Sequence, residues 1–284
     1  MKELLNDNTL FVEVVMARQG SKALVLVVEG KDEEFLLKKH LDREQVTLVA
    51  GQGGKQNILK VATRVSADPL IDGVGFLIDS DYDRVIDPAI TYPNTVFTSS
   101  RHDAVIDVLA TNWPLIEQVI EAHSRKKSVS GASVRLKALA LASELSVLRV
   151  LNDRLDLSLN LQNFPFGELP DPATSDSIAR IALARSGLVS YDTEMLTAKM
   201  KEEAERIKHI DKEHLVGDHD YFKALASVLK LEGITPGFEN LVSSFLALVS
   251  CRHVSAADWY THIDTWAQEN DTQPFLCPSC ETTS

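Results

Sequence analysis

The chain has 284 residues, of which 44% are hydrophobic and 25% charged, and its 29 basic and 41 acidic residues give a net charge of −12. These proportions are those of an ordinary globular protein. They argue against a protein that binds nucleic acid broadly through a basic surface, because such binding needs cations that replace phosphate counterions. They remain compatible with a nuclease whose acids are concentrated in a metal site. Without a signal-peptide pattern or a long apolar run, we expect a cytoplasmic protein with no membrane partner.

Strand and helix patterns alternate over residues 1–112. Apolar runs too short for helices predict buried strands at residues 24–28, 46–50, 74–78 and 95–98. Apolar residues at helical spacing predict helices at residues 33–41, 55–66 and 102–110. This alternation predicts a mostly parallel sheet with right-handed crossovers and flanking helices.

Beyond Trp113 the strand pattern nearly disappears. Helical spacing recurs instead over residues 115–123, 132–151, 175–186, 193–209, 221–231, 238–252 and 256–268. The segment 164–172 is rich in proline and glycine and is expected to form an ordered loop or linker. We therefore predict an α/β catalytic domain, residues 1–112, followed by a mostly α-helical domain, residues 113–284, that serves for partner docking, dimerisation or the substrate groove.

Acidic residues stand where two of the predicted strands leave the sheet. Glu29 and Gly30 follow the first strand, and Asp79, Asp81 and Asp83 follow the third at alternate positions. Carboxylates at the carboxyl edge of a parallel sheet can hold hard divalent cations. Taken alone, both segments also suit turns, but three like charges repel each other unless a cation offsets them. We predict a Mg²⁺ or Mn²⁺ site for phosphodiester chemistry, with Glu29 as a metal ligand or a general acid–base.

A glycine-rich segment, Gly51-Gln52-Gly53-Gly54-Lys55, follows the second predicted strand. Gly53 and Gly54 could adopt positive φ and present backbone amides to a phosphate, with Lys55 as a point charge. The spacing is not that of a Walker A loop. A plain flexible turn is the alternative.

Two further aspartates follow the fourth predicted strand. Asp103 and Asp107 lie one helical turn apart near a helix N-terminus. They could complete a second metal site, with Arg101 or His102 meeting phosphate. A helix cap with dipole-favoured acids is the alternative.

The two acidic segments together resemble the EGxxD and DxDxD motifs of the Toprim family, which includes topoisomerases, bacterial primases and OLD-type nucleases. The resemblance covers roughly residues 20–110 and takes Asp32 as the acid of the first motif. It implies that Glu29 is the catalytic glutamate, that Asp79 and Asp81 are the metal-binding pair, and that Asp83 is a supporting ligand. A topoisomerase or primase would need a strand-passage domain or an N-terminal zinc ribbon, and the sequence shows neither.

The second half of the chain supports a narrower resemblance. Val216-Gly217-Asp218-His219-Asp220 precedes a predicted helix and is similar to a segment of the AriB-type effectors of the PARIS anti-phage defence system, although Asp218 separates Gly217 from His219. A capping aspartate is the ordinary alternative. The resemblance implies a toxic effector nuclease in abortive infection that cleaves host tRNA. It also implies an ABC-type ATPase partner that holds the effector inactive, and a homodimer as the active form. An OLD-like DNA nuclease and a non-catalytic docking subunit are the alternatives.

The three cysteines do not make a disulfide framework. Cys277-Pro278-Ser279-Cys280 is a lone CxxC motif, which would need two further ligands to bind zinc. Cys251 and His253 are the candidates. A tail with unpaired thiols explains the same residues, and the sequence leaves both interpretations open.

Overall fold

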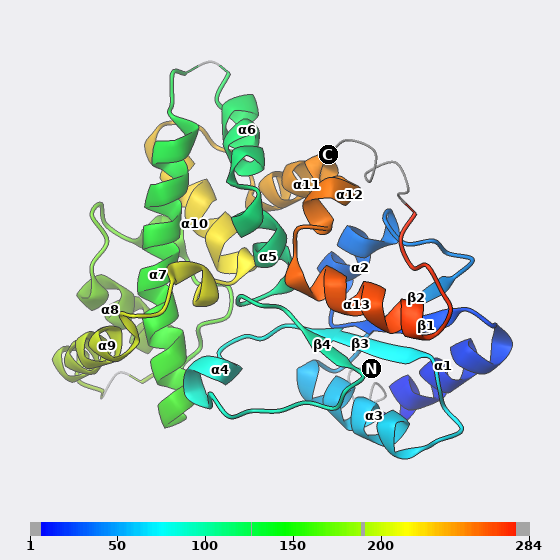
Figure 1. The fold of residues 1–284 in the computed structure, drawn as a ribbon. Coiled ribbons are helices and arrows are strands. Elements are labelled where there is room, and N and C mark those ends of the chain that lie inside the picture. The colour runs from blue at the N-terminus through cyan, green and yellow to red at the C-terminus, as the bar shows by residue number, and fades with distance from the viewer. Residues whose placement is uncertain (1–6, 126, 189–190, 277–284) are drawn as a thin grey trace. The chain divides into compact units, whose positions relative to one another are not determined.

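The computed structural model describes residues 7–125, 127–188 and 191–276, so Cys277 and Cys280 lie outside the described residues. The described residues form two compact units. Residues 7–80, 90–111 and 249–276 make up the first, called here the α/β unit, and residues 81–89 and 112–248 make up the second, the helical unit. Figure 1 labels the helices and strands of both units.

Four parallel strands form the sheet of the α/β unit, in the order β2-β1-β3-β4. They are β1 (Leu24–Val28), β2 (Val46–Ala50), β3 (Val74–Ile78) and β4 (Val96–Thr98). Val28 is in register with Ala50 on one side and Leu77 on the other, so the carboxyl ends of three strands are level. The prediction of an α/β fold with a parallel sheet is confirmed. Every residue of β1 and β3 is buried, as continuous apolar strands require.

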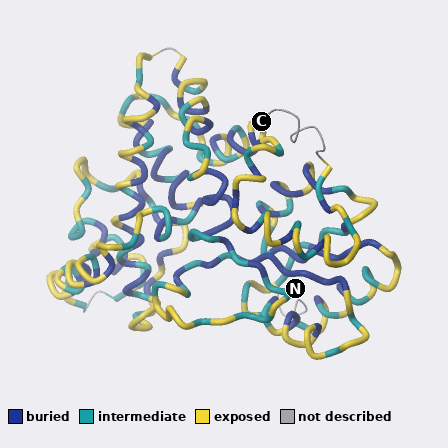
Figure 2. Tube along the Cα trace, viewed as in Figure 1, coloured by how far each residue is buried: buried dark blue, intermediate teal, exposed yellow. Residues whose placement is uncertain are grey.

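Helices cover both faces of this sheet. Helices α1 (Asp7–Gly20) and α3 (Lys55–Ala67) pack on one face, where Leu10 and Val14 meet alternate strand residues. Helices α2 (Lys31–Lys38) and α13 (Asp258–Glu269) cover the other, and α5 (Ala104–Thr111) packs beside α2. Figure 1 shows α13 and α3 on opposite sides of the strands, and Figure 2 shows the central strands dark blue along their length.

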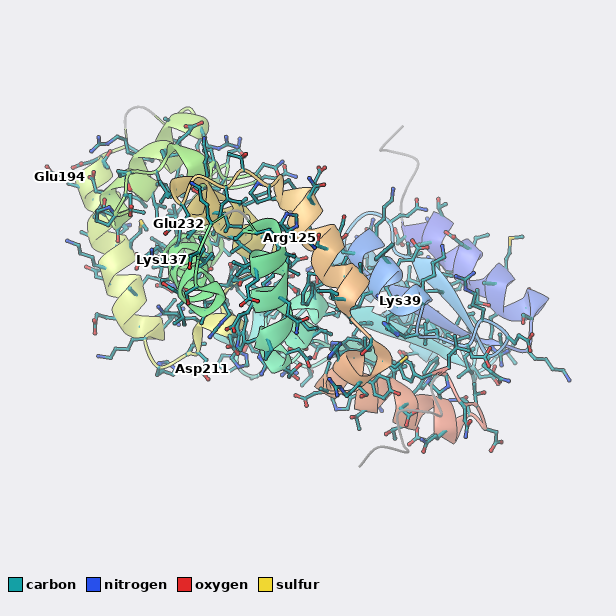
Figure 3. The ribbon with its side chains drawn as sticks, turned by 90° about the horizontal axis from the view of Figure 1, so that it is seen from above. Lys39, Arg125, Lys137, Glu194, Asp211 and Glu232 are labelled. Carbon is teal, nitrogen blue, oxygen red and sulfur yellow. The ribbon has the colours of Figure 1, made fainter. Side chains whose placement is uncertain are left out.

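The helical unit is built around one long helix, α7 (Gly131–Leu155), which packs against α6, α8, α9 and α10. Its helices are α4 (Asp83–Ile86), α6 (Trp113–His123), α8 (Ser175–Arg185), α9 (Thr193–Ile207), α10 (Asp218–Leu231) and α11 (Phe238–Leu248). Short 3₁₀ turns occupy Phe166–Glu168 and Lys212–His214. An ion pair of 3.2 Å between Lys137 of α7 and Glu232, at the end of α10, joins two residues that Figure 3 labels.

The structure differs from the sequence-based prediction at both ends of the chain. Residues 7–20 form a helix that the sequence did not predict. The predicted helix 238–252 is two helices, because α11 ends at Leu248 and a capping box at Ser250 starts α12 (Cys251–Val254). Residues 249–276, expected in the helical domain, pack with the sheet instead. Among the described residues, no helix combines the length and the hydrophobicity needed to span a membrane.

Candidate metal centre

The ends of the two central strands bring two acidic side chains together. Glu29 is the first residue after β1, and Asp79 is the first residue after β3. The backbone N–H of Asp79 donates a hydrogen bond of 3.2 Å to Oε2 of Glu29. Both residues are half-buried. The parallel pairing of β1 with β3 thus places these two carboxylates at one sheet edge, where α/β proteins bind ligands.

The N-terminus of α5 meets the same acids. Asp103, which is 4% exposed, directly precedes this helix, and its Oδ1 accepts the N–H of Ile106 at 2.7 Å. The N–H of Ala104 donates to Oδ1 of Asp79 at 3.1 Å. Free amides and the positive end of the helix dipole favour carboxylates here. His102 lies next to this pair, with its Nδ1 3.4 Å from Oδ2 of Asp103.

Glu33, in the first turn of α2, is a further member of the group, and the sequence analysis missed it. Its side chain is buried, and its negative charge is the strongest of those that act on Asp79. A Cβ atom on Gly30 would lie only 3.0 Å from Oε2 of Glu33, so glycine leaves room for the side chain to fold back. Asp32, taken from the sequence as the acid of the motif, is half-buried in the first turn of α2. Helical spacing could have identified Glu33, because Leu36 and Leu37, three and four residues later, are buried.

The pKa of Asp79 is raised well above its ordinary value. Burial is the main cause, followed by the negative charges of Glu33, Asp103 and Glu29, while the hydrogen bond from Ala104 acts in the opposite direction. We call Glu29, Glu33, Asp79 and Asp103 the acid cluster. Its oxygen donors suit a hard cation such as Mg²⁺ or Mn²⁺, whose charge would offset the mutual repulsion.

No three ligand atoms of the acid cluster lie close enough together to hold one cation by themselves. Across the described part of the α/β unit, no three acidic, histidine or cysteine side chains place ligand atoms within 4.8 Å of one another. Mg²⁺ usually retains several waters and needs only one or two carboxylates from the protein. A cation bound at the acid cluster would therefore need water molecules to complete its coordination.

Asp107, predicted as a second metal ligand, has structural contacts. It is fully buried, and its Oδ2 accepts the N–H of Ser100 at 2.8 Å. Its Oδ1 accepts the N–H of Arg101 at 2.9 Å and the Arg101 guanidinium at 3.3 Å. Burial raises the pKa of Asp107, and these donors act in the opposite direction. The aspartate and Arg101 thus fix the loop between β4 and α5.

Two serines that the sequence analysis did not single out join the ends of β3 and β4. The N–H of Ser80 donates to Oγ of Ser99 at 2.8 Å, and the Ser80 hydroxyl donates to the carbonyl oxygen of Ser99. The Ser99 hydroxyl donates to the carbonyl oxygen of Arg101 at 2.9 Å. These bonds hold Ser80, the residue after Asp79, in place.

The glycine-rich segment lies beside the end of β1. Gly51 donates its N–H to the Val28 carbonyl at 2.6 Å. A Cβ atom there would lie 2.5 Å from Ile58 and 2.8 Å from that carbonyl, so the position requires glycine. Gly53 and Gly54 have φ of 85° and 78°, in the left-handed region, and Lys55 begins α3. The positive φ values expected from the sequence are present.

Asp81 and Asp83 belong to the helical unit. The strand ends at Ile78, and Asp81 has a φ of 48°, so the alternation of an extended strand does not continue through these positions. Asp83 begins α4. Between them, Tyr82 is buried in a cluster with Val150, Ile207 and Leu215 of the helical unit.

No protein-family model matches the chain, and a search of curated proteins finds no significant match. The resemblance to the Toprim family therefore depends on the motifs themselves.

Proposed function

We propose that this chain is a divalent-metal-dependent nuclease of the Toprim type. The observation that supports this most is the acid cluster, in which Glu29 and Asp79 meet at neighbouring strand ends and Glu33 and Asp103 act on Asp79. Partly desolvated carboxylates that repel one another destabilise a fold unless a cation is bound. Such an arrangement is typical of a functional site rather than of a structural one.

The residues divide into distinct proposed roles. Asp79, Asp103 and Glu33 would hold Mg²⁺ or Mn²⁺, one or two of them directly and the rest through its bound waters. A bound cation of this kind activates water and stabilises the charge that develops on a phosphodiester. Glu29 accepts the Asp79 N–H, which orients its carboxylate for proton transfer or metal binding.

Phosphate recognition is proposed for two neighbouring segments. The backbone of Gly53 and Gly54, with positive φ, precedes Lys55 at the start of α3. Amides in such turns, together with a lysine, can receive phosphate oxygens. His102 lies on the loop before α5, beside Asp103, where it could reach the same substrate.

The resemblance to AriB-type effectors supports the biological part of the proposal. The chain would be the toxic effector of an anti-phage system, cleave host tRNA as a homodimer, and be held inactive by an ABC-type ATPase. The net charge of −12 is compatible with an effector that is harmless until assembled, because an acidic chain has low general affinity for nucleic acid.

A cleavage assay with matched variants tests the proposal. Purified protein is incubated with tRNA or with duplex DNA, in Mg²⁺, Mn²⁺ or chelator. We expect metal-dependent cleavage of tRNA that falls by about a hundredfold or more in Glu29→Gln and Asp79→Asn. The controls, Glu44→Gln and Asp72→Asn, make the same chemical changes at exposed positions before β2 and β3, at the opposite end of the sheet.

The same variants are then expressed in cells, with and without a co-expressed ATPase of the ABC type. We expect toxicity from the wild type and from both controls, and none from Glu29→Gln. Cleavage of DNA alone would favour an OLD-like nuclease. Toxicity that survives Glu29→Gln, with no metal-dependent cleavage of either substrate, would contradict the proposed function and favour a docking subunit.

A further inference from the structure

A cavity in the helical unit lies along the side of α10. Its volume is about 470 Å³, which is within the range of small-ligand sites. Two buried phenylalanines, Phe164 and Phe166, form part of its wall, with ring centroids 5.5 Å apart. Pro236 and Phe238, at the start of α11, form another part. This apolar and aromatic wall suits a ligand that has a flat, apolar part.

Two lysines line the same cavity, and no acidic residue of the described chain does. Lys223 and Lys230 lie seven residues apart on α10, about two helical turns, and so share one face of the helix. Nζ of Lys223 donates a hydrogen bond of 2.7 Å to Oδ1 of Asn163 and lies 5.1 Å from the centroid of the Phe238 ring. Partial burial lowers the pKa of Lys223. Its ammonium is therefore held at the cavity wall and is less hydrated than that of a surface lysine.

These two lysines differ from a cation of the adjoining cavity. Lys137 lines that cavity and pairs with Glu232 at 3.2 Å, and Figure 3 labels both residues. Within the described residues, neither Lys223 nor Lys230 forms an ion pair with a carboxylate. In a chain with a net charge of −12, a cavity that has two lysines and no acid is complementary to an anion.

We propose that this cavity binds one nucleotide, either free or as a unit of a single-stranded nucleic acid. The lysines would contact phosphate oxygens, and the apolar wall would cover the base. Asn163, Ser227 and Thr235, which also line the cavity, carry amide and hydroxyl groups that can hydrogen-bond a base or a sugar. An acidic peptide has the same charge but lacks the flat ring of a base, so the aromatic wall favours a nucleotide.

The lining residues all belong to the helical unit. Nucleotide binding here needs neither a divalent cation nor the acid cluster, so it goes beyond the proposed function and is tested separately from it. Binding without any metal-dependent cleavage would contradict the proposed function and leave the nucleotide site intact.

Fluorescence anisotropy in the presence of chelator tests the proposal. The full chain is titrated into a short, fluorescein-labelled oligoadenylate, with AMP, inorganic phosphate and polyglutamate as competitors. We expect saturable binding that AMP displaces and that phosphate and polyglutamate do not. Tighter binding of the oligoadenylate than of AMP would assign the cavity to a nucleic-acid strand, and equal affinities would assign it to the free nucleotide.

The two lysines are tested by replacement with glutamine. Lys223→Gln and Lys230→Gln should each weaken binding by about tenfold, because each removes a charged hydrogen bond to phosphate. Each should also reduce the slope of log K against log salt concentration by about 0.7, as expected for one phosphate contact on a single strand. The control Lys208→Gln makes the same change of charge in an exposed pair with Glu205 and should bind as the wild type does.

Gly167 provides a test that leaves the lysines unchanged. It lines the cavity, and a Cβ atom there would meet nothing within 4 Å. Gly167→Glu should therefore add a carboxylate to the cavity wall without a steric clash and weaken binding by about fivefold or more. Gly167→Gln, which has the same shape without the charge, is the matched control and should change binding little. Circular dichroism that matches the wild type would show that each variant folds.

Four outcomes would overturn the proposal. They are no saturable binding by the wild type, no displacement by AMP, affinity unchanged in both lysine variants, and equal affinities of Gly167→Glu and Gly167→Gln. Displacement by polyglutamate that is as effective as displacement by AMP would replace the nucleotide with an acidic peptide. Equally effective displacement by inorganic phosphate would remove the base from the site.

Discussion

Two sets of buried acids, one in each unit, are accommodated in opposite ways. In the helical unit, Asp220 receives two hydrogen bonds from Arg149, at 2.5 and 2.9 Å, and Glu203 receives bonds from Arg154 and Arg206. In the α/β unit, Asp79 accepts a backbone N–H, and the charges that act on it are those of other acids. Arginine pairing is a structural solution, whereas a group of like charges costs stability until a cation is bound.

The pKa directions follow this contrast. Burial acts to raise the pKa of Glu203, but the hydrogen bonds from Arg206 and Arg154 outweigh it, and the pKa is lowered. For Asp79, burial and the neighbouring acids act together, and the pKa is raised. Removing the charge of Glu203 should therefore destabilise the helical unit, whereas removing the charge of Asp79 should stabilise the metal-free α/β unit.

The largest effect is expected at Arg149. Arg149→Met leaves Asp220 buried without its cation and also removes a bond of 2.8 Å to the carbonyl of Leu161. We expect a loss of about 3–5 kcal/mol in the free energy of unfolding, measured by urea denaturation. Arg180→Met, in an exposed pair with Asp176, is the control and should cost less than about 1 kcal/mol. Equal small effects would show that the buried pair is not structural.

Glu203 should show an effect that depends on pH. Glu203→Gln is expected to cost about 2 kcal/mol at pH 7, because it weakens charged hydrogen bonds from two arginines. Since the folded pKa lies below the ordinary 4.5, the unfolded chain takes up the proton first as the pH falls. The difference between wild type and variant should be complete above about pH 4.5 and shrink below it.

The control for Glu203 is Glu205→Gln, which alters an exposed pair with Lys208. It should change stability little at any pH. A Glu203→Gln effect that stays constant between pH 7 and pH 3 would show that the carboxylate charge contributes nothing.

The same substitution at Glu33 and at its neighbour Glu34 compares the inner face of α2 with its outer face. Glu33→Gln should weaken binding of Mn²⁺ by about tenfold, as loss of a supporting carboxylate does. Glu34, which pairs with Lys38 at 3.6 Å on the helix surface, should tolerate the same change. Isothermal titration calorimetry measures both, and equal affinities for the two variants would remove Glu33 from the acid cluster.

The smallest expected effect is a gain in stability, opposite in sign to the losses expected for Arg149→Met and Glu203→Gln. Asp79→Asn should stabilise the chelator-treated protein by about 1 kcal/mol, because it relieves repulsion with Glu33, Asp103 and Glu29. Saturating Mg²⁺ should then stabilise the wild type by about 2.7 kcal/mol at a hundred times its dissociation constant, and the variant not at all. Destabilisation of the metal-free protein by Asp79→Asn would contradict the account.

The strands could be predicted from the sequence because each is a short apolar run that must be covered on both faces. Helix α1 could not, because its run Phe-Val-Glu-Val-Val is as typical of a strand, and only packing of Leu10 and Val14 against the sheet decides for a helix. The break between α11 and α12 could not be predicted either. It depends on the capping box at Ser250, in which His253 is an unusual residue for the third helical position.

The meeting of Glu29 with Asp79 could also be predicted, since parallel neighbouring strands end at one edge. Asp107 could not be separated from Asp103 by spacing, because only the loop amides of Ser100 and Arg101 reveal its structural contacts. The course of the chain through Asp81 and Asp83 could not be predicted. The chain leaves the sheet after Ile78, and the alternating pattern of aspartates does not indicate the positive φ of Asp81.

Direct titration with Mn²⁺ tests the central claim, that the acid cluster binds a divalent cation. Wild type, Asp79→Asn and the control Asp72→Asn are titrated in parallel, with free Mn²⁺ followed by electron paramagnetic resonance. The account predicts saturable binding by the wild type and by Asp72→Asn that is lost in Asp79→Asn. No saturable binding by the wild type, or the same binding by all three proteins, would contradict it.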